Sequence, residues 1–246
     1  MKNFISAKSE IAKNTIIAEG VQIFGHVTIR SNVVIEPNVI IGHPSPTEQS
    51  QIRSYFSQMQ QNLPYEEIYD SCVISKTIID EGVVIRSGSI IYSGTHIYKN
   101  ADIAHNCLIR ENAIIGIGTQ IITGTQIMAS VSIGHDCRIA GTLCNRTNVG
   151  NCTSMLGHAM HKCKMYIPGE IELSPHFGNG VMVGREVAII GNVKIGDLSI
   201  IGAGSVVTKS IPEGTIWAGN PIIQIGSRKT SECLELITRI KCYEKN

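Results

Sequence analysis

The central part of the chain carries an isoleucine at every sixth position. The run includes Ile79, Ile85, Ile91, Ile97, Ile103, Ile109, Ile115, Ile121, Ile127, Ile133 and Ile139. A period of six matches neither the 3.6 residues of a helical turn nor the two-residue repeat of a single half-buried strand. The chain must therefore make an equal turn every six residues, which predicts a hexapeptide β-helix.

A smaller or β-branched residue stands two positions before each of these isoleucines. This second set is Thr77, Val83, Ser89, Thr95, Ala101, Cys107, Ala113, Thr119, Thr125, Val131 and Cys137. We expect the large residue to fill the axis of the coil, while the small one lets the chain bend. Burying an aliphatic side chain contributes about 1.5–3 kcal/mol, so this column is the predicted core.

The same period begins earlier and returns later in the chain. Its further members are Ile11, Ile17, Ile23, Ile29, Ile35 and Ile41, and then Val183, Ile189, Ile195, Ile201 and Val207. Aromatic residues make up only 5% of the sequence, which leaves no material for a second large core. We therefore predict an all-β protein in which residues 1–226 form one solenoid.

Composition argues against several classes of partner. The formal net charge is +1 and the charged residues are scattered, so no basic stripe is present that would bind nucleic acid. No apolar stretch approaches the roughly 20 residues of a membrane span, and the beginning, MKNFISAKSE, has no apolar signal core. We expect a cytoplasmic protein without nucleic acid or membrane partners.

The cysteines follow the coil rather than a metal or redox motif. None of the eight forms a CxxC pair, and Cys107 and Cys137 occupy the small-residue positions of the repeat. We expect reduced cysteines that serve as packing residues.

The first interruption of the repeat spans residues 43–72. Pro44 and Pro46 stop the coil, and the segment that follows places Ile52, Tyr55, Phe56 and Met59 at the spacing of a short amphipathic helix. We predict an inserted helix that packs on the coil or on a neighbouring subunit.

The second interruption follows Ile139, because the next two positions of the repeat hold Asn145 and Asn151. The sequence then enters GHAMHKCKMYIPGEIELSPHFGNG, and we expect the active-site loop at residues 157–180. After the last repeat, residues 227–246 predict a C-terminal helix. Its apolar members are Cys233, Leu236, Ile237, Ile240 and Tyr243. Thr230 or Ser231 is suited to cap this helix, which we expect to close the end of the solenoid.

Four motifs resemble the hexapeptide-repeat acyltransferases. MLGHAMH and the closing segment VKIGDLSIIGAGSVVTKSIPEGTIWAGNP resemble the galactoside, maltose and xenobiotic acetyltransferases. The stretch VVIRSGSIIYSGTHIYKNADIAHNCLIREN is similar to enzymes that N-acylate amino sugars of nucleotide-linked precursors. GHDC at residues 134–137 resembles the turn that carries the base in UDP-N-acetylglucosamine acyltransferases.

The resemblance implies more than the period does. It implies a left-handed triangular coil with three hexads per turn, a homotrimer with active sites in the grooves between subunits, and acetyl-CoA or another acyl-CoA as co-substrate without a metal. The implied activity is acyl transfer, most simply acetyl transfer, to an amine or hydroxyl of a carbohydrate-like or sugar-nucleotide acceptor.

Such a transfer needs a group that removes a proton from the acceptor, and histidine suits this role at neutral pH. His158 matches the base of the family in MLGHAMH and is the predicted catalytic residue. His135, with the neighbouring Asp136, and His105 are alternatives as bases or as acceptor-binding residues. His105 and His135 are five hexads apart, so they are expected on different faces of one subunit and to meet only across an interface. His161 and Asn145 are further predicted substrate contacts.

The resemblance also implies the coenzyme site. The matching positions are Gly184, Arg185, Gly202, Ala203, Gly204, Thr208 and Lys209. At most of these turns the coil itself also favours small residues.

Two positions depart from the pattern of that acetyltransferase branch. Val183 stands where the branch usually has tryptophan, and GNPII replaces an ending with a basic residue. Lys209, or Arg228 or Lys229 further on, is then the candidate for a phosphate contact.

Two other functions remain open for this fold. A carbonic anhydrase of the hexapeptide family needs three converging histidines, and HAMH has the wrong spacing for its pattern. A non-enzymatic scaffold would show a flat, repeated outer array, whereas the outward residues here vary. The sequence does not identify the acceptor or decide between O- and N-acylation.

Overall fold

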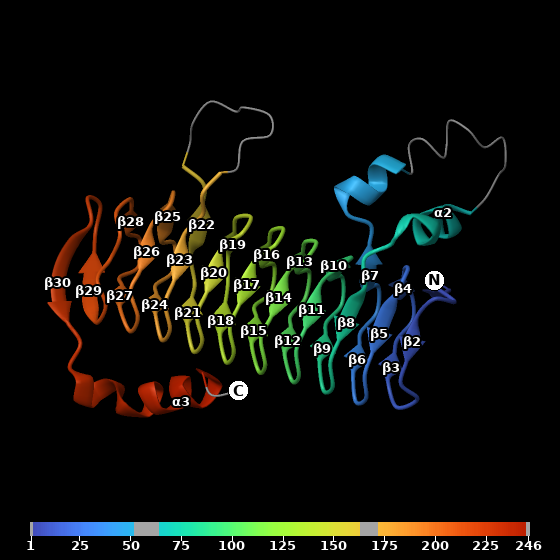
Figure 1. The fold of residues 1–246 in the computed structure, drawn as a ribbon, viewed down its shortest axis with the longest axis horizontal. Coiled ribbons are helices and arrows are strands. Elements are labelled where there is room, and N and C mark those ends of the chain that lie inside the picture. Colours follow the sequence, from blue (N-terminus) through green and yellow to red (C-terminus); the bar gives the residue numbers. More distant parts are fainter. Residues whose placement is uncertain (1, 52–63, 163–171, 245–246) are drawn as a thin grey trace.

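The computed structural model describes residues 2–51, 64–162 and 172–244. The described chain is a left-handed parallel β-helix in which three sheets form the faces of a triangular coil, as predicted. We call these faces sheets A, B and C, in the order in which the chain visits them. Figure 1 shows the coil with its axis running across the view.

Sheet A consists of β1 (Phe4–Ile5), β4 (Gln22–Ile23), β7 (Ile40–His43), β10 (Ile90–Tyr92), β13 (Leu108–Ile109), β16 (Gln126–Ile127), β19 (Thr142–Leu143), β22 (His158–Met160), β25 (Ala188–Ile190) and β28 (Val206–Val207). Sheet B consists of β2 (Glu10–Ile11), β5 (Val27–Ile29), β8 (Thr77–Ile79), β11 (His96–Ile97), β14 (Ile114–Ile115), β17 (Ser132–Ile133), β20 (Asn148–Val149), β23 (His176–Phe177) and β26 (Lys194–Ile195). Sheet C consists of β3 (Ile16–Ile17), β6 (Val34–Ile35), β9 (Val84–Ile85), β12 (Asp102–Ile103), β15 (Gln120–Ile121), β18 (Arg138–Ile139), β21 (Ser154–Met155), β24 (Met182–Val183), β27 (Ile200–Ile201), β29 (Thr215–Ala218) and β30 (Ile223–Ser227).

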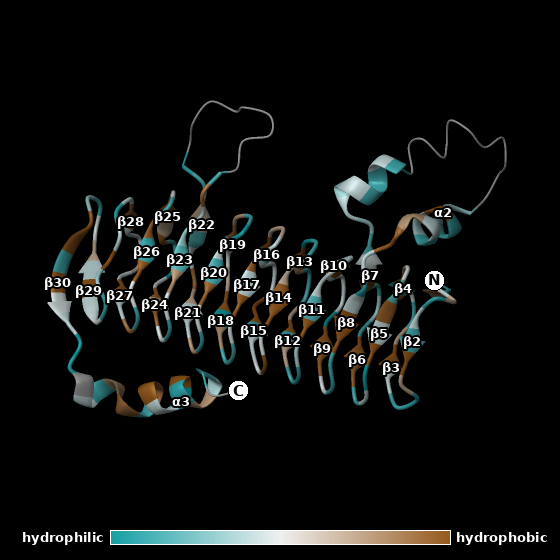
Figure 2. Cartoon of the chain, viewed as in Figure 1, coloured by the Kyte–Doolittle hydropathy of each residue, from teal (hydrophilic) through white to brown (hydrophobic). Residues whose placement is uncertain are grey.

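The register confirms three hexads per turn. Ile91 pairs with Ile109, its equivalent on the next coil eighteen residues later. The central isoleucines are buried along the axis, and the small residues two positions before them are buried as well. Cys107 and Cys137 are buried free thiols, as expected, and burial raises the pKa of the Cys137 thiol to about 12. Figure 2 shows apolar residues along many of the strands and polar residues at the turns.

The column of buried residues does not stop after Ile139, contrary to the prediction. It continues through Leu143, Val149, Met155 and Ala159, because the turns after Ile139 and Met155 are each two residues shorter than a hexad. Gly141 makes the first short turn possible, since its φ of +99° is a conformation that side chains disfavour. A shortened turn moves the apolar residue to a new phase, and a strict count of six misses it.

The first excursion leaves the coil between β7 and β8, within the predicted interval. Residues 46–51 are helical and α2 spans Tyr65–Cys72, while the amphipathic segment predicted around Ile52–Met59 lies outside the described residues. Buried Glu48 holds this excursion on the coil through hydrogen bonds from Ser45, Ser93 and the N–H groups of Ile74 and Ser75. Burial alone raises the pKa of Glu48, but these bonds lower it to about 2.

The second excursion lies between β22 and β23. Because 158–160 and 176–177 are strands of the coil, it is shorter than the predicted loop of residues 157–180, and residues 163–171 lie outside the described chain. Both excursions leave the corner where the chain passes from sheet A to sheet B, and Figure 1 shows them on the same side of the coil.

The C-terminal segment forms a helix, but it does not close the end of the coil as predicted. Ile211 and Ile222 belong to the buried core at that end, and Trp217 packs against it. Strand β30 pairs antiparallel with β29, and the N–H of Arg228 then donates to Gly214 at the corner between sheets B and C. From there the 3₁₀ turn η1 (Thr230–Cys233) and helix α3 (Leu234–Glu244) run back along the B–C corner (Figure 1).

Candidate active site

His158 is the first residue of strand β22 and points outward from sheet A, because the next residue, Ala159, is in the core. Its N–H donates to Val187 on the following coil, and its strand neighbours are Thr142 and Ala188. Both neighbours are smaller than histidine, and the imidazole is only partly buried. Within the described residues no hydrogen bond or ion pair is recorded for this ring.

Glycines next to His158 allow the coils to stack closely. A Cβ on Gly141 would collide with the carbonyl oxygen of Gly157 and lie 3.4 Å from Cε1 of His158. A Cβ on Gly157 would lie 2.5 Å from the carbonyl oxygen of Val187. The backbone beside the imidazole is therefore fixed by residues that have no side chain.

The predicted coenzyme residues at the corner between sheets C and A continue this arrangement. Gly184 and Arg185 lie on the coil after His158, and Ala203 and Gly204 lie on the one after that. The N–H of Gly204 donates to Arg185 over 2.9 Å, and a Cβ on Gly184 would lie 2.6 Å from the N of Ala203. We call His158, Gly184, Arg185 and Gly202–Gly204 the C–A strip.

Arg185 supplies positive charge to this strip. Its side chain is exposed, and no ion pair is recorded for it among the described residues. A guanidinium in this position is suited to bind a phosphate or carboxylate.

The structure places the other predicted residues at different corners. Thr208 and Lys209 follow β28 at the A–B corner, where Lys209 Nζ lies 4.8 Å from the centre of the Trp217 ring at the end of the coil. Asn145 is also at the A–B corner, and its Oδ1 accepts a hydrogen bond from the N–H of Ala129 over 3.1 Å.

His161 lies just beyond β22, at the beginning of the second excursion. Its Nδ1 is 3.4 Å from the carbonyl oxygen of Leu173, and its Nε2 is 3.7 Å from Glu172 Oε2. These contacts hold the ring against the other end of the same excursion.

His135 and Asp136 lie at the B–C corner, beneath helix α3. The N–H of Ile117 donates to His135 Nδ1 over 2.8 Å, so in the neutral ring the proton is on Nε2. Burial lowers the pKa of His135, with a smaller opposing effect of Asp136. The ring of Tyr243 lies 4.8 Å from that of His135.

Asp136 anchors helix α3 to the coil. Arg239 Nε donates to its Oδ2 over 2.6 Å, and the Tyr243 hydroxyl donates to the same oxygen. Burial, with help from this bond, raises the pKa of Tyr243 to about 12. Both residues predicted from GHDC are therefore engaged in holding a helix.

His105 is exposed at the C–A corner, on the edge that carries the C–A strip, but three coils before His158. At about 4.8 Å per coil, the two rings are separated by roughly 14 Å along the axis. Its Nδ1 lies 3.7 Å from Glu36 Oε2. His105 and His135 lie at different corners of the chain, as the hexad count predicts.

Sequence reasoning did not single out His96. This residue points outward from sheet B, its Nε2 lies 3.2 Å from Oδ2 of the nearly buried Asp80, and its ring stacks on Tyr98. Arg30 Nε lies 2.9 Å from the other oxygen of Asp80. Asp80 and His96 are sixteen residues apart, close to one full turn, so they lie on adjacent coils. A search for motifs of neighbouring residues overlooks such a pair.

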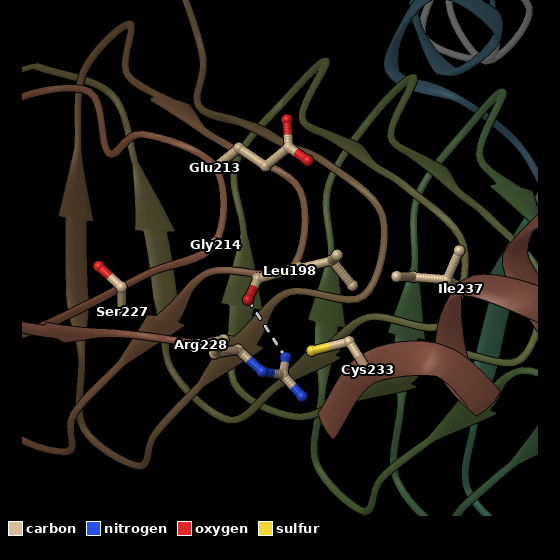
Figure 3. Close-up of a pocket in the computed structure, with 7 residues that line it drawn as sticks. All are labelled: Leu198, Glu213, Gly214, Ser227, Arg228, Cys233 and Ile237. Carbon is tan, nitrogen blue, oxygen red and sulfur yellow. Dashed lines mark hydrogen bonds between the residues drawn. The ribbon is translucent and has the colours of Figure 1, made fainter. Parts of the chain in front are cut away.

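Arg228, the other candidate for a phosphate contact, lies at the B–C corner, where its Nη1 donates to the carbonyl oxygen of Leu198 over 3.2 Å (Figure 3). Within one chain it is therefore separate from the C–A strip.

Among the described residues, no group of three or more His, Cys, Asp or Glu side chains is arranged to hold a metal ion. None of the described helices has the length and apolar character needed to cross a membrane.

Comparison with known proteins finds one matching family model and a set of similar proteins. Residues 174–209 match the family model described as bacterial transferase hexapeptide (six repeats). The chain is 45% identical over 69 residues to galactoside O-acetyltransferase of Escherichia coli K12, which covers 28% of this chain and 34% of that protein. It is 44% identical over 52 residues to serine acetyltransferase 4 of Arabidopsis thaliana, covering 21% of this chain and 15% of the relative.

Both alignments span well under half of the length of these relatives. Among solved structures, a UDP-N-acetylglucosamine O-acyltransferase from Moraxella catarrhalis RH4 is 16% identical, with a TM-score of 0.49, over 95% of this chain and 76% of that one.

Proposed function

Since the comparisons support membership of the hexapeptide-repeat acyltransferase family, we propose that this protein transfers an acyl group from an acyl-CoA to a small acceptor, with His158 as the general base. One observation carries the proposal: the coil places Arg185 on the turn after His158, three residues before Ala188, which is the strand partner of His158, and it places Ala203 and Gly204 on the turn after that. A base, a cation and an unobstructed backbone edge then lie on consecutive coils.

In this reaction the acceptor carries an O–H or N–H group. His158 takes the proton from that group as its oxygen or nitrogen attacks the thioester carbonyl. The new ester or amide bond forms, the carbon–sulfur bond breaks, and the thiol of coenzyme A leaves with a proton. No covalent intermediate on the protein is needed.

The C–A strip suits the donor. Ala203 and Gly204 are exposed and a Cβ on Gly204 would meet nothing within 4 Å, so the thin pantetheine arm of coenzyme A can lie along the backbone edge there. Arg185 supplies a charge for a phosphate of the coenzyme. Lys209, stacked on Trp217, is the second cation near the end of the coil, and it is the alternative phosphate contact that the sequence suggests.

The acceptor that we propose is a carbohydrate or sugar nucleotide with a free amine or hydroxyl. This rests on the resemblance of residues 83–112 to N-acyltransferases of nucleotide-linked amino sugars and on the galactoside acetyltransferase relative.

We further propose a homotrimer, because a single chain leaves the C–A strip as an open edge without an opposite wall. Light scattering tests the assembly: a monomer at micromolar concentration would contradict it.

Release of free thiol from acetyl-CoA tests the activity, with panels of sugar nucleotides, galactosides and aminoglycosides as acceptors. We expect acceptor-dependent release that His158→Ala slows by about 10²–10⁴. Binding of coenzyme A and of dephospho-coenzyme A to Arg185→Ala and Lys209→Ala then identifies the phosphate contact. Loss of that contact makes the two ligands bind equally and reduces the effect of salt on binding.

A further inference from the structure

A cavity of about 430 Å³ lies between helix α3 and the B–C corner of the last coils. Its volume falls within the range of small-ligand sites, which is about 300–1,000 Å³. Figure 3 shows Leu198 in the middle, with Glu213 and Arg228 on either side of it and Ile237 of α3 facing them. This cavity lies at a different corner from the C–A strip, so it belongs to another site.

The two charged residues lie on adjacent backbone segments. Glu213 precedes Gly214, whose carbonyl oxygen accepts a hydrogen bond from the N–H of Arg228 over 2.7 Å. Despite this proximity, their side chains make no ion pair in the part of the chain that the structure describes. Opposite charges that line one cavity without pairing are available to a ligand that carries both signs.

The side chains of Arg228 and Glu213 can each still form hydrogen bonds with a ligand. One N–H of the Arg228 guanidinium donates to the carbonyl oxygen of Leu198. For its other N–H groups, no hydrogen bond is recorded among the described residues, so they can donate to a ligand. Glu213 is exposed, and no partner of its carboxylate is recorded among those residues. Ser227 also lines the cavity, and Figure 3 shows its hydroxyl directed away from the Arg228 guanidinium.

The remaining wall is apolar. Leu198 and Ile237 line the cavity, and Ile237 also borders a smaller adjoining cavity of about 190 Å³ together with Ile240. Lys241 and Glu244 line this second cavity at its rim. Asp197 also lines the second cavity, so the combined space offers cations, carboxylates and an aliphatic surface, with Arg228 and Glu213 as the charged pair of the larger cavity.

We propose that this cavity binds an α-amino acid with an aliphatic side chain. Arg228 binds the carboxylate, Glu213 binds the ammonium group, and the side chain packs between Leu198 and Ile237. This site does not depend on the proposed acyl transfer. A ligand here would also fill the space beneath α3, so it stabilises the helix in its docked position.

Calorimetric titration of the whole protein with L-leucine tests the proposal. We expect saturable binding to the wild type and a rise in the melting temperature with leucine concentration. Leucinamide lacks the carboxylate and N-acetyl-leucine lacks the ammonium group, so each is expected to bind about tenfold more weakly or worse. Equal binding of all three compounds, or no saturation with leucine, overturns the proposal.

Variants of the protein give an independent test. Glu213→Gln and Arg228→Gln should each weaken leucine binding by about tenfold. Glu235→Gln and Lys229→Gln, which change exposed charges nearby that do not line the cavity, should leave it unchanged. Arg228→Gln also loses its bond to Leu198, so the comparison of leucine with its single-charge analogues remains the deciding measurement if that variant does not fold. Displacement of leucine by coenzyme A would assign the cavity to the acyl donor and reject the proposal.

Discussion

Two Gly-His pairs of this chain have similar sequences but different surroundings. His158 follows Gly157 and lies on sheet A as part of the C–A strip, with no recorded partner for its ring among the described residues. His135 follows Gly134 and lies at the B–C corner, where its Nδ1 accepts a backbone N–H and Tyr243 packs against its ring. A base must offer a free nitrogen lone pair, so these surroundings favour His158 as base and His135 as an anchor of helix α3.

The largest difference between the two pairs should appear in catalysis. We expect His158→Ala to lower the rate of thiol release by about 10²–10⁴, the usual contribution of general acid–base catalysis, with almost unchanged coenzyme A binding. His135→Ala should lower it by no more than a few-fold.

His176→Ala is the matched control for this experiment. Like His158, His176 is the first, outward-pointing residue of a coil strand, but it lies on sheet B and its ring contacts Asn148. A rate that falls only in His135→Ala would reverse the assignment of the two histidines. Equal, small effects at all three would indicate that the acceptor loses its proton without help from the protein.

The period of six in the sequence was sufficient to predict the coil, its core and the separation of His105 from His135. It fails where turns are shortened, as at Gly141 and Gly157, because local backbone geometry there changes the count without leaving a repeated signal. A strict hexad count therefore predicted that the core ended at Ile139, whereas it continues through Leu143.

The site was less accessible to sequence reasoning than the fold. The motifs predicted His158 and the glycines of the C–A strip as separate segments, and the coil stacks them on consecutive turns. The engagement of Asp136 by Arg239 and Tyr243 joins residues more than a hundred positions apart. No period or local motif predicts where a terminal helix docks, since this depends on long-range side-chain contacts.

The glycines beside His158 allow a second, smaller test. Gly141→Ala places a methyl group against Gly157 and imposes a φ of +99° on a side-chain-bearing residue, so we expect a loss of about 1–3 kcal/mol in the free energy of unfolding. The displaced backbone carries His158, so the rate of thiol release should fall as well.

Gly124→Ala is its control. Gly124 lies at the same C–A corner one coil earlier, has a φ of +74°, and a Cβ there would meet nothing within 4 Å. Only the conformational cost, about 1 kcal/mol, should remain, and the rate should be unchanged. Chemical denaturation and thiol release measure both effects. Equal losses in the two variants would show that close stacking of the coils is not what fixes the His158 backbone.

Weakening the Asp136 anchor of helix α3, beside His135, should have a smaller and more local effect on stability. Tyr243→Phe removes the hydroxyl that donates to Asp136, which typically costs about 1 kcal/mol. We expect faster hydrogen exchange in α3, unchanged exchange in the coil strands, and a rate of thiol release within a few-fold of wild type. Thr238→Val, on the exposed side of the same helix, is the control for a change in α3 alone. A loss of activity comparable to that of His158→Ala would place α3 in the catalytic machinery.

The smallest expected effect is a pH dependence of the α3 anchor. Burial lowers the pKa of His135 below its ordinary value of 6.5, so the unfolded or detached state takes up the proton at a higher pH than the docked one. The stabilisation is therefore complete above about pH 6.5 and is lost as the pH falls through the lowered value. Protonation of Nδ1 also removes the acceptor for the N–H of Ile117, so hydrogen exchange in α3 should accelerate between pH 7 and 5 beyond the intrinsic change of exchange rate.

His135→Asn separates this effect from other titrations. The side-chain oxygen of asparagine can accept the same N–H but does not titrate, so α3 should lose the additional pH dependence while remaining docked. Asp136 accepts the hydrogen bonds from Arg239 and Tyr243 in both proteins, so this part of the anchor is common to them. A difference between the two proteins that appears as the pH falls below 6.5 therefore reports His135. If the exchange profiles of wild type and His135→Asn coincide, the imidazole does not control docking, and Asp136 alone is the anchor.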